Sequence, residues 1–370
     1  MQQTEKQRVM EIASHFQYEG TLLEIKPHGN GHINDTYLLT YGVGKMGCIP
    51  VILQRMNKNV FPQPVELMEN VSNVTKFLYD KIVKNGGNPY RETLNVIPTK
   101  EGMSYYKEME MDYWRSFVYI SDATSYDMVE KPEDFYQCGL GFGKFQSLLS
   151  DFPAETLHET IVNFHNTKSR FADFKKAVEE DVAGRAKEVQ PEIQFVLDHE
   201  ADASVFVDLI EKGEVPLRVT HNDTKLNNIM IDDKTHQAIC VIDLDTTMPG
   251  LAMYDFGDAI RSGASTAVED ETDLSKVACD LELFDMFTKG FIEGCQNKLT
   301  EKELELMPMG AKIMTFECGM RFLTDHLQKD VYFKTSRENH NLDRARTQFK
   351  LVSDMEAKWD KMHEIVNKYK

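Results

Sequence analysis

The segment from Val219 to Thr246, VTHNDTKLNNIMIDDKTHQAICVIDLDT, constrains the fold of this chain more than any other segment. A short apolar strand, Leu217 to Val219, is expected to lead into a polar loop. A second apolar strand, Ala238 to Ile242, is expected to end in two aspartates. Because a hairpin separates the two strands, they can lie side by side. The pattern predicts one site built from the loops that follow both strands.

The residue types in these loops are those that phosphoryl transfer requires. The reaction needs a carboxylate that orients the attacking hydroxyl and accepts its proton, and oxygen ligands for the Mg²⁺ that bridges the phosphates of ATP. We predict that Asp223 is this base and contacts the acceptor, that Lys225 reaches the transferring phosphate, and that His221 holds the loop. The predicted Mg²⁺ ligands are Asn228, Asp243 and Asp245. Singly, each loop could be a polar turn or a helix cap, but their order together favours a kinase.

The chain resembles the superfamily of aminoglycoside phosphotransferases and choline kinases through this HxDxxxxN and IDxD pair. Further blocks resemble its N-acetylhexosamine 1-kinase branch: Thr247 to Ser265, Phe164 to Thr167, Arg321 to Lys334, Gly29 to Leu39 and Ile52 to Asn57. The resemblance implies an α+β protein-kinase-like fold, with a strand-rich amino-terminal lobe and a mainly helical carboxyl-terminal lobe. It also implies transfer from MgATP to the anomeric hydroxyl of N-acetylglucosamine or N-acetylgalactosamine.

Length and charge agree with a two-lobed enzyme for a small substrate. A chain of 370 residues exceeds the size at which a single core keeps growing, so we expect lobes at residues 1–120 and 121–370. The net charge of −18 disfavours nucleic acid and anionic membranes as partners. The amino terminus has no signal-peptide pattern and no window has the length of a membrane span, so a cytoplasmic protein is expected. The sequence makes no prediction of the oligomeric state.

The six cysteines are scattered without a CxxC pair, so neither zinc nor a disulfide framework is expected. Hydrophobic periodicity separates a strand-rich first third from a helical remainder. The predicted strands are Thr21 to Ile25, Asp35 to Tyr41, Ile49 to Arg55, Leu94 to Pro98, Ser104 to Glu108 and Tyr113 to Ile120. The predicted helices include Thr4 to Phe16, Val65 to Lys84 and a final one from Arg344 to Tyr369. Another begins at Pro132, with one apolar face formed by Phe135, Cys138, Phe142, Phe145 and Leu149.

A glycine-bearing turn between the first two predicted strands is a candidate phosphate loop. Glycine permits close approach of the backbone to an anion, although such a turn is more often a plain hairpin. We predict nucleotide contacts at Gly29, Gly31 and Asn34. By resemblance, His32 is a candidate sugar contact, with a plain surface histidine as the alternative.

The strand that should offer a lysine to the phosphates reads VILQRMN, so Gln54 or Arg55 must replace it. Strand alternation sends these two side chains to opposite faces. We favour Arg55, which keeps the positive charge. The alternative is that Arg55 is a solvated strand residue and Gln54 makes the contact. The adenine is expected against the segment Val118 to Ser121 that joins the lobes, at Val118 and Ile120.

The acceptor side is predicted from the carboxyl-terminal half. By resemblance, Arg321 and Tyr332 contact the sugar, since an arginine can donate several hydrogen bonds and a tyrosine can cover an apolar ring face. The alternative is an arginine paired with Asp325 or Asp330. An ion pair between Asp258 and Arg261 is expected to shape the same cleft. Two rival functions stay open: a kinase for another small alcohol, such as an aminoglycoside, choline or another sugar, and a catalytically silent nucleotide- or sugar-binding protein.

Overall fold

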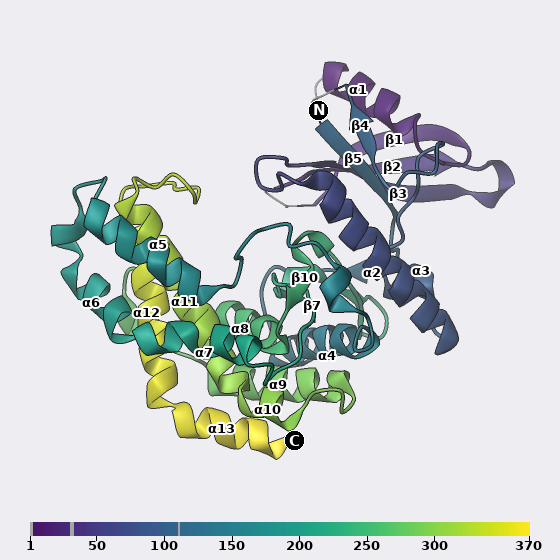
Figure 1. The fold of residues 1–370 in the computed structure, drawn as a ribbon. Helices are drawn as coiled ribbons and strands as arrows, with labels where there is room; N and C mark the ends of the chain where they lie inside the picture. The colour runs from purple at the N-terminus through teal and green to yellow at the C-terminus, as the bar shows by residue number, and fades with distance from the viewer. Residues whose placement is uncertain (1–2, 30–32, 110–111) are drawn as a thin grey trace. The chain divides into compact units, whose positions relative to one another are not determined.

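The computed structural model describes residues 3–29, 33–109 and 112–370 and divides the chain into two compact units (Figure 1). Unit 1 consists of Met1–Thr124, Asp151–Ile161 and Met230–Met248. Unit 2 consists of Ser125–Ser150, Val162–Ile229 and Pro249–Lys370. Unit 1 therefore takes two segments from beyond the boundary that the sequence predicts at residue 120.

Unit 1 is built on an antiparallel sheet with the strand order β1-β2-β3-β5-β4. Its strands are β1 (Thr21–Pro27), β2 (Asp35–Gly42), β3 (Cys48–Met56), β4 (Tyr106–Glu108) and β5 (Asp112–Val118). In β2, Tyr37, Leu39 and Tyr41 are buried and the residues between them are more exposed, as expected for a strand with one face on a core. The helix α1 (Gln3–Ala13) packs Val9 and Ile12 into that core.

The remaining elements of unit 1 lie after and beside this sheet. They are α2 (Pro64–Lys84), α3 (Pro89–Glu92), β6 (Ala123–Thr124), β8 (Ile229–Asp232) and β9 (Ala238–Val241). The last three form a small sheet in the order β6-β8-β9. A separate two-stranded sheet pairs β7 (Arg218–Thr220) with β10 (Met248–Gly250). The strands β7 and β9 carry the two predicted catalytic loops at their ends.

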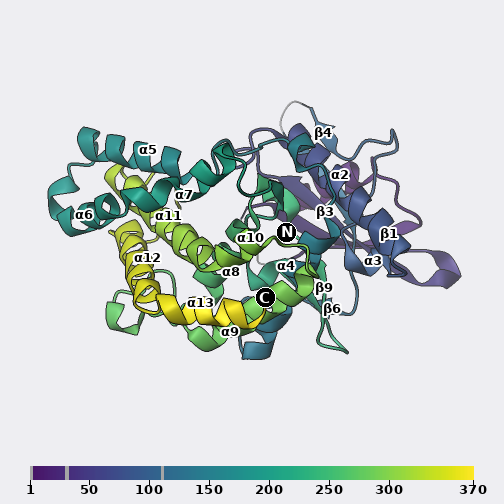
Figure 2. The same ribbon diagram turned by 60° about the horizontal axis from the view of Figure 1, so that its bottom comes forward.

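Helices form most of unit 2. They are α4 (Pro132–Leu148), α5 (Thr167–Glu180), α6 (Gln190–Asp198), α7 (Glu200–Glu211), α8 (Ala252–Gly263), α9 (Leu281–Cys295), α10 (Glu301–Glu305), α11 (Met307–Leu327), α12 (His340–Ala357) and α13 (Trp359–Lys368). Figure 1 shows α11 beside α5, α8 and α12, and it packs against all three. In Figure 2, α13 lies along α9, against which it packs. Within the described part of the chain, no helix combines the length and apolar character needed to cross a bilayer.

The helices α4 and α9 approach at backbone distance because glycines face each other. A Cβ atom placed on Gly294 would lie 2.6 Å from the carbonyl oxygen of Leu140. The apolar face that the sequence predicts for the helix after Pro132 is confirmed: Phe135, Phe142 and its other members are buried. The helix α4 also packs against β7, so its close contact with α9 supports the loop that follows β7.

Two predicted elements differ from the structure. Leu94 to Pro98 is not a strand, because it makes only an isolated bridge between Val96 and Phe117. The predicted final helix is two helices, since α12 ends at Ala357 and α13 begins at Trp359. Both misses concern segments whose local pattern is correct but whose pairing or direction depends on distant residues.

Candidate active site

Two buried aspartates of α8 hold the loop that follows β7. The carboxylate of Asp255 accepts the backbone N–H groups of His221 at 3.0 Å and Asn222 at 2.8 Å. The carboxylate of Asp258 accepts the N–H of Thr224 at 2.9 Å. Asp255 is completely buried, and burial raises its pKa. Because α8 is packed on α11, the loop is attached to a rigid helix rather than to other loops.

Asp223 is presented by this loop with both carboxylate oxygens contacted. The Nζ of Lys225 lies 2.6 Å from Oδ1, and the side-chain amide of Asn228 donates to Oδ2 at 3.1 Å and to the Asp223 carbonyl at 2.8 Å. The buried His221 ring accepts the Asp223 N–H at 3.3 Å and packs against Phe142. The structure thus brings together three predicted residues, Asp223, Lys225 and Asn228, within unit 2.

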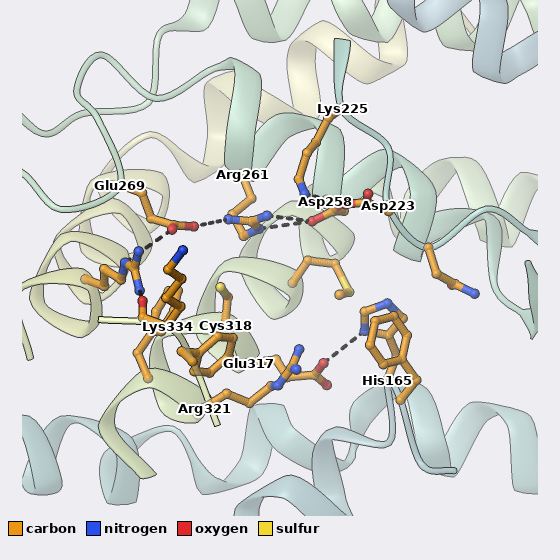
Figure 3. A pocket seen from close by; sticks show the side chains of 16 residues that line it. His165, Asp223, Lys225, Asp258, Arg261, Glu269, Glu317, Cys318, Arg321 and Lys334 are labelled. Carbon is orange, nitrogen blue, oxygen red and sulfur yellow. Dashed lines mark hydrogen bonds and ion pairs between the residues drawn. The ribbon is translucent and has the colours of Figure 1, made fainter. Parts of the chain in front are cut away.

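The charge of Lys225 is supported from two sides. Burial alone would lower its pKa, but the carboxylates of Asp223 and Asp258 outweigh it and raise the pKa. Burial would likewise raise the pKa of Asp258, but Arg261 and Lys225 hold it below its usual range. The predicted ion pair between Asp258 and Arg261 is confirmed, with a separation of 2.9 Å. An ordered row of alternating charges therefore leads away from Asp223 (Figure 3).

A pocket of about 430 Å³ in unit 2 opens at Asp223. Its wall mixes carboxylates, cations and aromatic rings, including Asp223, Arg261, Glu269, Glu317, Arg321, Phe164 and Phe333. Figure 3 shows these polar side chains converging from several helices and loops. Its size is within the range of pockets that hold small molecules. The wall offers donors and acceptors at many positions, which suits a ligand rich in hydroxyl groups.

Glu317 anchors the far wall of this pocket. Its carboxylate accepts a hydrogen bond from Nδ1 of His165 at 2.9 Å and from the hydroxyl of Thr167 at 2.5 Å. Burial would raise the pKa of Glu317, but the hydrogen bond from His165 and the charge of Arg321 hold it below its usual range. An ionised Glu317 fixes the proton of His165 on Nδ1 and fixes the orientation of the ring.

Arg321 lies on α11 among three aromatic rings. Its guanidinium carbon is 5.6 Å from the ring centres of Phe164 and Tyr332 and 5.4 Å from that of Phe333. The Tyr332 hydroxyl accepts a long hydrogen bond of 3.3 Å from Arg321. Of the two aromatic residues in this loop, Phe333 lines the pocket, and Tyr332 is 65 % exposed. The structure therefore joins the predicted pair Arg321 and Tyr332 and adds Phe333.

The loop that carries these aromatic residues is held by a single carboxylate. Asp325, almost fully buried, accepts the consecutive backbone N–H groups of Val331, Tyr332 and Phe333 at 2.8–2.9 Å, and the amide of Asn341 at 2.8 Å. The alternative that Asp325 pairs with Arg321 is not what the structure shows. Asp330, the other alternative partner, pairs with Arg185.

The predicted ligands after β9 belong to unit 1. Asp243 is exposed and has a left-handed backbone, with φ 57° and ψ 62°, directly after the strand. Asp245 is buried and forms an ion pair with Arg115, while the amide of Asn34 donates to its other oxygen at 2.7 Å. Asp245 is 4 % exposed and both of its oxygens contact protein groups, so it contributes to the structure of unit 1; its role as a metal ligand stays a prediction.

Arg55 lies on the opposite face of the sheet from Arg115, the ion-pair partner of Asp245. It forms ion pairs with Asp35 and Asp112, whereas Gln54 on the opposite face accepts a hydrogen bond from Arg115 at 3.0 Å. Strand alternation is the physical reason for this separation. Both side chains already have protein partners, so the choice between Arg55 and Gln54 as the phosphate contact stays a prediction.

Other predicted nucleotide contacts are described only in part. Gly29 has a positive φ of 75°, with open space where a Cβ would lie. Val118 pairs with Val51 at the end of β5, and Ile120 is buried. Gly31 and His32 lie outside the described residues.

Several residues of these sites were not predicted from the sequence. Arg115, Asp255, His165, Glu317 and Phe333 are the clearest cases. A signal existed for Arg115, which interrupts the apolar strand DYWRSFV, and for Asp255, which shares a helical face with Asp258. No local signal marks Glu317, because its partners His165 and Thr167 lie about 150 residues away, in the turn before α5 and at its first residue.

A cluster of side chains of the types that bind metal ions lies elsewhere in unit 2. It combines His199, Asp202 and Glu356, whose ligand atoms lie within 4.8 Å of one another. The Nζ of Lys312 is 2.6 Å from Asp202 and 2.9 Å from Glu356. The ammonium group of Lys312 therefore already forms ion pairs with both carboxylates of this cluster.

The sequence and the fold were compared with known proteins. A sequence model of the phosphotransferase enzyme family matches residues 113–278. Among solved structures, an aminoglycoside phosphotransferase from Alicyclobacillus acidocaldarius has a TM-score of 0.64 at 12 % identity, covering 97 % of this chain and 96 % of that one. A microcompartment-associated aminopropanol kinase has a TM-score of 0.59 at 14 % identity, with coverages of 97 % and 98 %. An amicoumacin kinase solved with AMP-PNP and Ca²⁺ has a TM-score of 0.56 at 12 % identity, with coverages of 97 % and 96 %.

These comparisons confirm the predicted α+β kinase-like fold, with an antiparallel sheet in the amino-terminal part and helices in the carboxyl-terminal part. The matched segment, residues 113–278, contains the loops after β7 and β9 and the helix α8. At identities of 12–14 %, the structural likeness shows the fold alone.

Proposed function

We propose that this protein is an ATP-dependent kinase for a small hydroxyl compound, and that the acceptor is the anomeric hydroxyl of an N-acetylhexosamine. The observation that carries this proposal is the carboxylate of Asp223, held by Lys225 and Asn228 at the wall of a polar pocket. A positioned carboxylate next to a pocket for hydroxyl groups is what a phosphoryl acceptor site needs. The match of residues 113–278 to the phosphotransferase enzyme family supports the same reaction class.

In this mechanism Asp223 orients the acceptor hydroxyl and takes its proton as the phosphoryl group arrives. Lys225 is close enough to Asp223 to turn toward the transferring phosphate and neutralise its charge. Asn228 holds Asp223 through its amide nitrogen, so its carbonyl oxygen is the atom suited to a cation. Asn228 in unit 2 and Asp243 in unit 1 are each proposed as a Mg²⁺ ligand, since each carries the hard oxygen that Mg²⁺ prefers, and the ion would supply charge neutralisation for the ATP phosphates.

The composition of the pocket favours a sugar over a cationic acceptor. Arg321 and Lys334 line it and form no ion pair among the described residues, so an aminoglycoside or choline would bring further positive charge against them. A monosaccharide instead can use both the arginine donors and the carboxylate acceptors of Glu269 and Glu317, with Phe164 and Phe333 against its apolar faces. A silent binding protein is disfavoured because binding alone does not require Asp223 with its two supporting groups.

The test is release of ADP from MgATP with a panel of free sugars, amino alcohols and aminoglycosides. We expect turnover with N-acetylglucosamine or N-acetylgalactosamine, and an acid-labile 1-phosphate without a reducing end. A reducing 6-phosphate, or turnover of only choline or an aminoglycoside, would overturn the acceptor assignment and leave the kinase assignment intact. Absence of ADP release with every acceptor would overturn both.

A further inference from the structure

Two arginines differ from every other arginine in this acidic chain. Of the twelve arginines in the sequence, ten form an ion pair with a carboxylate. Among the described residues, Arg170 and Arg321 have no carboxylate partner. With 60 acidic against 42 basic residues, carboxylates are abundant in this protein. Two unpaired arginines are therefore unexpected, and it matters that they lie together.

The packing of α5 on α11 places Arg170 and Arg321 side by side. At the start of the contact, the hydroxyl of Thr167 donates to Glu317 at 2.5 Å. Near its end, the N–H of Ala183 donates to the carbonyl of Leu327 at 3.1 Å, so the two helices run in the same direction. Arg170 is three residues after Thr167, and Arg321 is four residues after Glu317. Each arginine is thus one turn beyond the first contact and on the same face.

The hydrogen-bonding groups of both guanidiniums are largely unused. The three aromatic rings around Arg321 hold its position through their faces and take up only one donor, the long bond to Tyr332. The Nε of Arg170 is shielded from solvent and has no hydrogen-bond partner among the described residues. Burial and the nearby positive charge of Arg321 lower the pKa of Arg170. A buried donor without a partner costs free energy that a ligand can recover.

Neighbouring carboxylates do not remove the excess positive charge. The exposed Asp173 forms no ion pair with Arg170 among the described residues, and the buried Glu317 is already hydrogen-bonded to His165 and Thr167. Its one negative charge faces two guanidiniums. A pair of arginines with open forks is suited to an oxyanion, because each fork can donate two parallel hydrogen bonds to a carboxylate or a phosphate.

We propose that Arg170 and Arg321 form a subsite for an anionic group of the acceptor, so that the preferred acceptor is a sugar bearing a carboxylate or a phosphate. This inference rests on the proposed function, since it assigns the pocket beside Asp223 to the acceptor. Arg321 lines that pocket and Arg170 lies beside Arg321 on α5, so the anion would bind at the wall that Glu317 anchors. The two arginines act here as substrate-binding residues that decide between charged and neutral acceptors.

The experiment compares three acceptors in ADP-release assays: N-acetylglucosamine, its 6-phosphate, and N-acetylmuramic acid, which carries a carboxylate. The proteins are the wild type, R170Q, R170K and the control K176Q, which removes a positive charge from an exposed position of the same helix. In the wild type we expect kcat/KM to be at least about tenfold higher for one charged sugar than for N-acetylglucosamine. R170Q should reduce that advantage to less than about threefold, and R170K should retain part of it.

Binding of the same sugars without nucleotide, measured by calorimetry, separates the two proposals. If no acceptor releases ADP but a charged sugar binds and R170Q abolishes its binding, the kinase assignment fails and the anionic subsite stands. If N-acetylglucosamine is turned over at least as well as both charged sugars, the subsite proposal is overturned and the kinase assignment stands. Equal losses for charged and neutral sugars in R170Q would also overturn it, as would an equal loss in K176Q. Melting of each variant at the wild-type temperature excludes a folding defect.

Discussion

Arg115 in unit 1 and Arg321 in unit 2 are both close to predicted site residues, yet their surroundings are opposite. Arg115 is 2 % exposed and donates to Asp245 and to Gln54, so protein groups satisfy its charge. Arg321 is partly exposed, contacts aromatic rings and has no carboxylate partner among the described residues. The first arrangement is closed and stabilises the fold, whereas the second is open toward a pocket and suits a ligand. The partners of a charged side chain, rather than its burial alone, therefore indicate its role.

The largest effect is expected at the open pocket, from Asp223→Asn. The amide keeps the shape and the contact with Asn228 but cannot accept the acceptor proton, so kcat should fall by roughly two to four powers of ten. The sugar KM should change much less, and thermal melting should be unaffected. Steady-state kinetics with the preferred acceptor measure this. An unchanged kcat would remove Asp223 from the role of base.

Substitution of Arg115 in unit 1 should instead lower the free energy of unfolding. Arg115→Met leaves Asp245 buried without its cation, and breaking such a pair typically costs about 3–5 kcal/mol. The protein has two tryptophans, so in a Trp359→Phe background Trp114 reports the unfolding of unit 1 in urea. Adding Asp245→Asn to Arg115→Met should recover part of the loss. If the free energy of unfolding of Arg115→Met is within about 0.5 kcal/mol of that of the parent, the ion pair between Arg115 and Asp245 does not stabilise the fold.

Arg321→Ala tests whether the arginine of unit 2 affects acceptor kinetics rather than stability. Losing donors in a desolvated site should cost about 1–3 kcal/mol in kcat/KM for the acceptor, a loss of roughly five- to 150-fold. The KM for ATP should stay nearly constant, and the free energy of unfolding should change by about 1 kcal/mol or less. Arg337→Ala, an ion-paired arginine in the segment that links α11 to α12, is the control. If Arg321→Ala lowers the free energy of unfolding by several kcal/mol but leaves kcat/KM for the acceptor unchanged, Arg321 is structural like Arg115.

The smallest effect is expected for Arg55→Gln. Its partners Asp35 and Asp112 are partly exposed, and exposed ion pairs contribute about 1 kcal/mol or less. The KM for ATP should change by no more than about twofold to threefold. The free energy of unfolding should change by no more than about 1 kcal/mol. A tenfold rise in the KM for ATP would instead support Arg55, rather than Gln54, as the phosphate contact.

Much of the fold follows from local sequence. The alternation in β2, the apolar face of α4 and the two apolar strands that precede the catalytic loops are local patterns, and each was predicted. Asp223, Lys225 and Asn228 were also predicted, because they lie within six residues of one another. The structure then shows them in direct contact.

Residues whose partners are distant in sequence were harder to predict. Arg115 pairs with Asp245, 130 residues away, and His165 bonds Glu317, 152 residues away. Nothing in their local patterns identifies these partners, since helix packing and strand register decide them. The isolated bridge at Val96 illustrates the same limit for the fold, because a strand requires a neighbour in register.

The carboxylate of Asp325 has a consequence for how the acceptor range could change over evolution. It binds the backbone of residues 331–333, not their side chains, so the path of this segment does not depend on which amino acids occupy it. Substitutions at Tyr332, which is 65 % exposed, can therefore leave the path of this segment unchanged, whereas Phe333 also packs against Phe322. A carboxylate that binds only the backbone would let new specificities arise by one substitution at a time, and makes position 332 suitable for a saturation library.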